Sequence, residues 1–148
     1  MINWNTVKDY EDITFKQANG VARVAFNRPE VRNAFRPKTV DELLDALIIC
    51  HESQEIGVVL LTGEGPSEKD DGWAFCSGGD VREAVSYVKA APEGLSAEPY
   101  FREEYNLDNI IATYSKPIIS LVNGVVMGGG LGLCHNGTIT IVSEMIKC

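Results

Sequence analysis

Two glycine-rich turns contain the residues whose types and spacing could support chemistry. The first covers residues 76–80, with sequence CSGGD, and the second is the glycine triplet at 128–130. Glycine has no Cβ, so its backbone N–H can approach a ligand closely, and a helix that begins directly afterwards adds unpaired N–H groups. Two such amides directed at one oxygen would form an oxyanion hole for a thioester or ester carbonyl. Either turn alone could simply be tight, but two, each between a strand and a helix, favour a site.

Nucleotide-binding motifs are the competing interpretation of these glycines, and they fail at specific positions. A G-x-G-x-x-G fingerprint would need glycine at position 133 or 135, where the chain has leucine and histidine. A P-loop beginning at Gly132 would need lysine at position 138, which is threonine. The sequence therefore argues against a dinucleotide or nucleoside triphosphate site.

Nucleophile and metal sites also have little support. The four cysteines are far apart, with no C-x-x-C pair and no histidine placed to complete a zinc set. Cys76 adjoins the first turn, but no basic neighbour is present to lower its pKa, so we expect a buried thiol. His51 and His135 have no evident nucleophile beside them and are expected to pack or to lie at the surface.

The composition limits the class of partner. The chain has 148 residues, 45% hydrophobic and 23% charged, which is ordinary for one globular domain. Its net charge of −8 argues against nucleic acid or an anionic membrane as partner, because both select a basic face. No apolar stretch is long enough to span a bilayer and no signal-peptide pattern is visible, so we expect a cytoplasmic protein.

The strands expected to position the two turns are apolar and short. Asn19-Gly20 favours a hairpin between strands at 13–16 and 21–26. Further apolar runs typical of buried strands lie at 57–62, 73–76, 118–122 and 138–142.

Helices are expected between these strands. The residues at 39–42 form a capping-box pattern, and apolar residues follow at helical spacing. A second helix is expected from about Phe101 and a third after the glycine triplet, while residues 63–72 and 90–99 are typical of surface loops. This order predicts a single α/β domain covering residues 1–148.

Three segments, taken in order, carry a resemblance to a known family. They are residues 27–34 (NRPEVRNA), residues 74–80 (AFCSGGD), and residues 116–130, in which KP leads to NGVVMGGG. With these segments the sequence resembles the crotonase (enoyl-CoA hydratase/isomerase) superfamily of acyl-CoA enzymes. The resemblance implies the crotonase (ClpP-like) ββα-spiral fold, of which this chain would form the N-terminal core portion only. The family's C-terminal helices, which complete the acyl pocket and the trimer contacts, would lie beyond Cys148.

The two halves of the chain resemble different branches of the superfamily. Residues 28–37 and 65–76 are similar to the 1,4-dihydroxy-2-naphthoyl-CoA synthase branch. Residues 101–133 are similar to the 3-hydroxyisobutyryl-CoA hydrolase branch. A mosaic and a divergent member that kept features of both are equally compatible with this pattern.

The resemblance assigns roles to individual residues. The family's oxyanion amides come from the residue before the aspartate of the first turn and from the middle glycine of the second, here Gly79 and Gly129. Arg82 stands where family members often place a cation near the CoA phosphates, although an exposed helix charge explains it equally well. The path along the CoA nucleotide corresponds to Val31, Arg32, Asn33, Ala34, Ser77, Gly78, Asp80 and Gly128.

The match is weakest at the acid/base residues. Gly132 stands where the hydratases carry a glutamate, and a glycine side chain cannot transfer a proton, although both branches named above lack that glutamate too. In the hydrolase branch a glutamate matching Glu104 contacts the substrate; a solvated helix face is the alternative explanation for residues 103–104. The hydrolase's second catalytic glutamate would fall beyond Cys148.

The resemblance implies an acyl-CoA-binding protein that stabilises a thioester oxyanion or enolate, like an enoyl-CoA hydratase/isomerase or a 3-hydroxyacyl-CoA hydrolase. Coenzyme A would enter as part of the substrate, with no permanently bound cofactor and no metal. The alternative is a non-catalytic CoA-binding module or an oligomeric interaction module. The family also implies a homo-oligomer based on trimers.

Overall fold

A six-stranded sheet forms the centre of the computed structural model, which describes residues 1–66, 72–90 and 98–148. The first two strand pairs are antiparallel and the remaining pairs are parallel. In spatial order the strands are β1 (Asn5–Asp9), β2 (Ile13–Ala18), β3 (Val21–Phe26), β4 (Val58–Gly63), β6 (Ile118–Val122) and β8 (Ile139–Val142). This mixed sheet with helices confirms the expected α/β class.

The hairpin between β2 and β3 forms where the sequence predicts it. Asn19 and Gly20 both adopt left-handed conformations, with φ of 49° and 81°, which a two-residue turn requires. The edge strand β1 was not expected from the sequence. Its residues, NTVKD, are mostly exposed, so no alternation of apolar and polar residues marks it, and pairing with β2 alone defines it.

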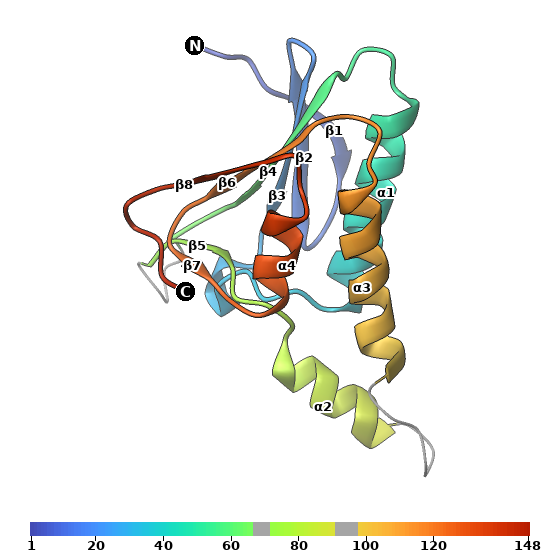
Figure 1. The fold of residues 1–148 in the computed structure, drawn as a ribbon, viewed down its shortest axis with the longest axis vertical. Coiled ribbons are helices and arrows are strands. Elements are labelled where there is room, and N and C mark those ends of the chain that lie inside the picture. Colours follow the sequence, from blue (N-terminus) through green and yellow to red (C-terminus); the bar gives the residue numbers. More distant parts are fainter. Residues whose placement is uncertain (67–71, 91–97) are drawn as a thin grey trace.

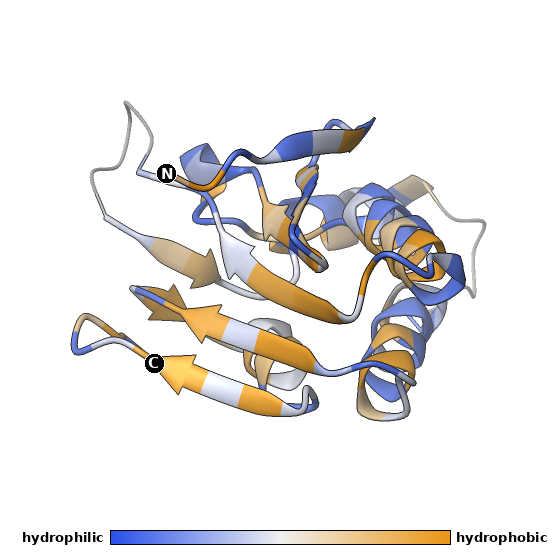
Figure 2. Ribbon diagram, turned by 90° about the horizontal axis from the view of Figure 1, so that it is seen from above, coloured by the Kyte–Doolittle hydropathy of each residue, from blue (hydrophilic) through white to orange (hydrophobic). Residues whose placement is uncertain are grey.

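Two helices cover one face of the sheet. Helices α1 (Pro37–Glu52) and α3 (Glu98–Ala112) lie side by side (Figure 1). Leu47 of α1 and Ile111 of α3 face Leu61 of β4 in the hydrophobic core. Figure 2 shows that hydrophobic residues concentrate on the strands and recur along these helices. Helix α3 begins three residues before the expected position, and most of the loop expected at 90–99 lies outside the described residues.

The start of α1 differs from the sequence prediction. The helix begins at Pro37, so Thr39 lies inside its first turn and does not cap it. The Thr39 hydroxyl accepts a hydrogen bond from the Arg36 N–H at 3.1 Å and donates one to Asp12 at 2.7 Å. Glu42 accepts hydrogen bonds from the backbone N–H groups of Glu11 and Asp12 rather than from its own helix. The capping interaction thus lies three residues earlier than predicted, with Arg36 as the N-cap and Thr39 as the third helical residue, while Glu42 bonds to the loop before β2.

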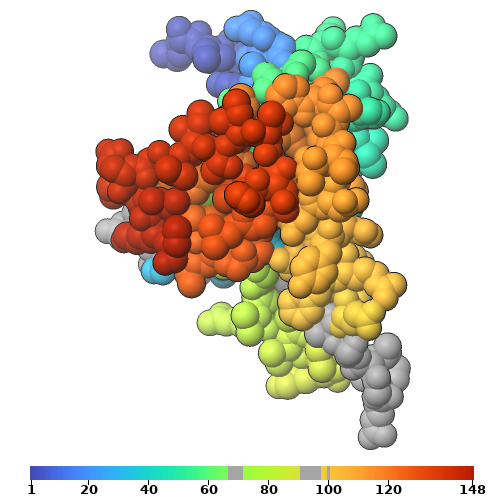
Figure 3. Space-filling view, viewed as in Figure 1, coloured from blue at the N-terminus to red at the C-terminus, as the bar shows by residue number. Residues whose placement is uncertain are grey.

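A small second sheet brings the two glycine-rich turns together. It pairs β5 (Ala74–Cys76) in parallel with β7 (Val125–Val126). Helix α2 (Val81–Ala90) follows the first turn, and α4 (Gly129–His135) begins within the second. Helix α2 has no buried residue and projects from the rest of the molecule (Figure 3). Within the described ranges, no helix is long and apolar enough to cross a membrane.

Candidate active site

The two glycine-rich turns are in direct contact, although about fifty positions separate them in the sequence. The Met127 N–H donates to the Cys76 carbonyl at 3.1 Å, which continues the pairing of β5 with β7. A Cβ on Gly78 would lie 2.9 Å from the Met127 oxygen and 3.3 Å from the Gly129 nitrogen. Gly78 also has φ of +96°. Only glycine fits here, because both the backbone conformation and the close approach exclude a side chain.

The Gly79 and Gly129 N–H groups remain available for a ligand. The Phe35 N–H donates to the Gly78 carbonyl at 2.9 Å and the Asp80 N–H to the Phe35 carbonyl at 2.7 Å, so the first turn is held on both sides of Gly79. In the part of the chain that the structure describes, neither the Gly79 nor the Gly129 N–H donates a hydrogen bond. Gly129 is the first residue of α4, where the helix itself offers its N–H no acceptor. The geometry is compatible with the predicted oxyanion role.

A groove of about 460 Å³ begins at Gly79. Two arginines line this groove. Arg32 lies at the end of the short 3-10 helix η1 (Pro29–Val31), and Arg82 lies in the first turn of α2. Six of the residues predicted to line the CoA nucleotide form this groove: Val31, Arg32, Ala34, Ser77, Asp80 and Arg82. Gly78 and Gly128 are not among its lining residues and lie at the contact between the two turns.

Asn33 has a structural role that the sequence did not reveal. Its side chain is 1% exposed and lies outside the groove lining. Its oxygen accepts from the Arg28 N–H at 2.9 Å, and its amide nitrogen donates to the carbonyls of Glu64 and Ala74 at 2.9 and 2.8 Å. These bonds tie the segment after β3 to β5, so the Asn33 side chain positions the groove.

Replacing Asn33 with alanine is expected to lower the free energy of unfolding by about 2 kcal/mol, because the buried Ala74 carbonyl and the half-buried Glu64 carbonyl lose their donor. The matched control is Asn19→Ala. Asn19 also has a left-handed φ, 49° against 56° for Asn33, but its side chain is exposed. Urea denaturation of both variants separates the hydrogen bonds from the backbone strain. An equal loss of unfolding free energy in the two variants would contradict the positioning role of Asn33.

Asp80 is held by interactions within the protein. Its carboxylate accepts from the Arg28 guanidinium at 3.1 Å and from the Arg82 N–H at 3.1 Å, which caps the start of α2. Arg28 in turn donates to the Ala34 carbonyl at 2.6 Å. Asp80 therefore stabilises the first glycine-rich turn from within the protein, and Arg28 is a positioning residue that the sequence analysis missed.

Glu104 lies beside the second turn. It is only 9% exposed, whereas Glu103 faces solvent, so a solvated helix face explains Glu103 but not Glu104. A Cβ on Gly129 would overlap the Glu104 Oε1 and lie 2.7 Å from the Phe35 ring. Burial, followed by the charge of Asp108, raises the pKa of Glu104 above its ordinary value of 4.5. The predicted substrate contact is therefore next to the predicted oxyanion amide.

Asp108 is the site residue with the weakest signal in the sequence. It stands one turn after Glu104 on α3, and a Cβ on Gly132 would lie 2.8 Å from its Oδ2. Burial raises its pKa above 3.8, although a hydrogen bond from the Asn136 side chain opposes this shift. The sequence did contain one sign of this position. Glu104 and Asp108 are four residues apart, so they share a helix face, and that face adjoins the apolar Leu107 and Ile111.

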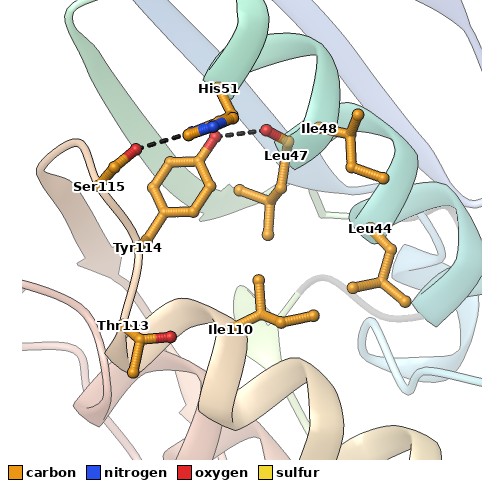
Figure 4. Close-up of a pocket in the computed structure, with 8 residues that line it drawn as sticks. All are labelled: Leu44, Leu47, Ile48, His51, Ile110, Thr113, Tyr114 and Ser115. Atoms are coloured by element: carbon orange, nitrogen blue, oxygen red, sulfur yellow. Dashed lines mark hydrogen bonds between the residues drawn. The ribbon is translucent and has the colours of Figure 1, made fainter.

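Cys76 and His51 have the non-catalytic surroundings that the sequence predicts. Cys76 is 0% exposed, and burial raises the pKa of its thiol to about 12. His51 lines a separate cavity of about 300 Å³ between α1 and α3, where its Nδ1 lies 2.8 Å from the Ser115 hydroxyl (Figure 4). Among the described residues, no carboxylate hydrogen-bonds to the His51 ring, so this pair lacks the third member of a hydrolytic triad.

Comparisons with known proteins support the family resemblance. Residues 21–148 match the family model for enoyl-CoA hydratase/isomerase. The 1,4-dihydroxy-2-naphthoyl-CoA synthase of Mycobacterium tuberculosis is 47% identical over 144 residues, covering 92% of this chain and 46% of that protein. Its counterpart in Mycolicibacterium smegmatis is 43% identical, covering 92% of this chain and 48% of that protein. The chain thus spans about half the length of these curated relatives.

Solved structures share the fold. A carnitinyl-CoA dehydratase from Mycobacterium thermoresistibile is 32% identical with a TM-score of 0.80, covering 93% of this chain and 38% of that one. The Pseudomonas aeruginosa protein PA4980 is 26% identical with the same TM-score, 0.80, covering 95% of this chain and 56% of that one.

The similarity to the naphthoyl-CoA synthases extends over 92% of the chain, well beyond the N-terminal half that suggested it. The resemblance of residues 101–133 to the hydrolase branch stays a prediction. The family model and the shared fold together show that this chain belongs to the enoyl-CoA hydratase/isomerase family, the crotonase superfamily.

Proposed function

We propose that this chain binds an acyl-CoA thioester and stabilises negative charge on the thioester oxygen with the N–H groups of Gly79 and Gly129. The observation that carries the proposal is the contact between the two turns, which leaves both N–H groups without a hydrogen bond in the described residues. An enolate or a tetrahedral oxyanion would be stabilised by the same two donors. The naphthoyl-CoA synthases and the carnitinyl-CoA dehydratase named above are, by name, enzymes of CoA thioesters, which supports this substrate class.

The groove beside Gly79 has the chemistry to hold the anionic part of CoA. A chain of net charge −8 repels a polyphosphate in general, so local cations are needed. Arg32 and Arg82 both line the groove, and guanidinium groups hydrogen-bond phosphate oxygens well.

The test is calorimetric titration with acetyl-CoA and, separately, with CoA. Both are expected to bind, and acetyl-CoA more tightly, because only acetyl-CoA has a carbonyl for the two amides. If neither acetyl-CoA nor CoA gives a heat of binding, the proposal is refuted. Hydrolysis and hydration assays on short acyl-CoA thioesters then distinguish an enzyme from a binding module.

Replacing Arg82 with glutamine is expected to weaken CoA binding about fivefold, the equivalent of about 1 kcal/mol for one exposed charge-assisted contact. The loss should shrink as salt is added, since the contact is screened. Arg102→Gln is the control, because Arg102 is an exposed arginine on α3 outside the groove lining. If the Arg82 and Arg102 variants bind CoA with the same affinity, the groove does not hold the phosphates.

An oligomeric interaction module is the second candidate function, and the exposed edge of the sheet favours it. Strand β8 ends the sheet, and its four residues are all exposed. Nearby exposed apolar side chains are those of Leu121, Leu131, Ile139, Ile141, Val142 and Met145. Such a surface is typical of a site of association. Light scattering would give the mass of the assembly, for which the family predicts a trimer-based form.

A further inference from the structure

The cavity between α1 and α3 has aliphatic walls and a polar end, where the side chains of His51, Tyr114 and Ser115 gather (Figure 4). Its aliphatic walls come from both helices and consist of Leu44, Leu47, Ile48 and Ile110. Ile48 is 56% exposed and Ile110 37%, so a ligand here would cover apolar surface that faces water. Since a cavity of about 150 Å³ can bind benzene, the cavity of about 300 Å³ has room for a larger apolar body.

The polar end of this cavity offers one free hydrogen-bond donor. The Nδ1 of His51 lies 2.8 Å from the Ser115 hydroxyl, and among the described residues neither side chain makes another hydrogen bond. If the hydroxyl donates to Nδ1, the neutral ring carries its proton on Nε2 and that N–H stays free. If the Nδ1–H donates instead, the Ser115 O–H stays free. Either tautomer therefore leaves one donor for a ligand.

The two other polar side chains of the lining already donate within the protein. The Thr113 hydroxyl donates to the Asn109 carbonyl at 2.8 Å, and the Tyr114 hydroxyl donates to the Leu47 carbonyl. Burial raises the pKa of Tyr114, which keeps its hydroxyl protonated and in place. A polar head group in the cavity is thus directed to the donor of the histidine–serine pair.

Charges around the polar end favour an anionic head group. Among the described residues that line the cavity none is acidic, although the chain has a net charge of −8. The Lys116 ammonium lies at the same end of α1 and donates to the carbonyls of Cys50 and Ser53 at 2.5 and 2.6 Å. The carbonyls at a helix C-terminus repel anions, and this ammonium offsets that effect. Glu52 is exposed and does not line the cavity.

We propose that this cavity binds a small amphipathic carboxylic acid, with its alkyl chain against the aliphatic walls and its carboxylate hydrogen-bonded by the His51–Ser115 pair. A carboxylate accepts a stronger hydrogen bond than a neutral oxygen does, and the pair has a donor to give. The cavity shares no lining residue with the groove at Gly79. The inference therefore goes beyond the proposed acyl-CoA function and does not depend on it.

The test is a titration of the 148-residue chain with hexanoate, followed by the NMR shifts of backbone amides. Hexanol and hexylamine have the same alkyl chain with a neutral and a cationic head group. Hexanoate is expected to shift amides of α1 and α3 with a dissociation constant of about 1 mM, as its size allows. It should bind about fivefold more tightly than hexanol or hexylamine. Equal affinities for the three compounds, or no shifts with hexanoate, would overturn the proposal.

The walls are tested with Ile48→Glu, which places a carboxylate in the cavity and should weaken hexanoate binding about tenfold or more. Val85→Glu is the matched control, because Val85 is an exposed apolar residue of α2, 46% exposed, outside the lining. Equal hexanoate affinities of the two variants would place the ligand elsewhere. If hexanoate fails to bind and Ile48→Glu lowers the mass measured by light scattering, a second copy covers the cavity and the proposal is wrong.

The head-group contact is tested with His51→Phe and Ser115→Ala, singly and combined. Each single variant keeps one donor, so its affinity for hexanoate should fall less than about threefold. The double variant has none and should bind hexanoate no more tightly than hexanol, while its affinity for hexanol stays unchanged. Both residues are exposed, and circular dichroism checks that the fold is intact. A double variant that still prefers hexanoate would overturn the contact.

Binding of acetyl-CoA provides the separation from the proposed function. Ile48→Glu and the double variant should bind acetyl-CoA like the unmodified protein, because neither changes the groove at Gly79. Failure of acetyl-CoA to bind would refute the proposed function and leave the hexanoate result standing. Displacement of hexanoate by CoA would show that the two ligands share one site, which would overturn the assignment of a separate cavity.

Discussion

Replacing Gly129 with alanine is expected to lower turnover of an acyl-CoA thioester by about 100-fold or more, the usual effect of losing one oxyanion donor. An added Cβ would overlap Glu104 and lie 2.7 Å from the Phe35 ring, so the second turn must move away from its neighbours. The Gly129 N–H moves with it and no longer points at the oxygen that Gly79 binds. Binding of acetyl-CoA should fall to that of CoA alone, and calorimetry measures both.

Gly57→Ala is the control for Gly129→Ala. A Cβ at Gly57 would meet nothing closer than a backbone oxygen at 3.9 Å, and its backbone does not require glycine. This variant should bind acetyl-CoA like the unmodified protein. If the Gly129 variant keeps its preference for acetyl-CoA while folded, as judged by circular dichroism, then Gly129 is not an oxyanion donor.

Replacing Asp12 with asparagine is expected to lower the free energy of unfolding by about 3–5 kcal/mol, the range for breaking a buried ion pair. Asp12 is 1% exposed and accepts hydrogen bonds from Arg36 at 2.8 Å through both of its oxygens. Arg28 lies 3.9 Å away and also binds Asp80. An uncharged residue 12 leaves Arg36 without its buried counter-charge and loosens the first glycine-rich turn. Urea denaturation measures the loss.

The same residue predicts a pH dependence with a definite sign. Burial alone would raise the pKa of Asp12, but hydrogen bonds from Arg36 and Thr39 outweigh it and lower the pKa below 3.8. The folded protein therefore binds this proton less readily than the unfolded chain. The stabilising contribution is complete above pH 3.8 and is lost as the pH falls through the lower folded value. Asp12→Asn should flatten the acid limb of the stability curve.

Asp45→Asn serves as the comparison for Asp12→Asn. Asp45 pairs with Lys8 at 2.5 Å, but their side chains are 44% and 49% exposed. An exposed pair contributes only about 0–1 kcal/mol, because solvent screens it. An equal loss of unfolding free energy in the two variants would show that the buried Asp12 ion pair stabilises the fold no more than the exposed one.

Most of the fold was predictable from the sequence, because local patterns mark its elements. The Asn19-Gly20 turn defines the hairpin, and the apolar run before Gly63 becomes β4. Two features of the fold were not predicted correctly, strand β1 and the start of α1, and both for the same reason. Strand β1 forms only because β2 pairs with it, and α1 starts at Pro37 because Thr39 bonds to Asp12 across the chain. Neither contact leaves a periodic pattern in the sequence.

The candidate site was predictable in its backbone and less so in its side chains. Gly79 and Gly129 were identified from the family's motifs, and the structure brings their turns together. Asn33 was assigned to the ligand, but the bonds of its buried side chain go to backbone groups. Asp108 was missed altogether, because a single acid on a helix is usually solvated.

The sequence alone predicted most of the strands and helices, the glycine turns and the family, because these depend on neighbouring residues or on contiguous motifs. The tertiary structure decided which carboxylates are buried. Glu103 and Glu104 are adjacent and chemically identical, yet only Glu104 is buried, beside Gly129. Burial depends on elements that are distant in the sequence, and it raises the pKa of Glu104. Pairing of β5 with β7 likewise decided that two tight turns form one site.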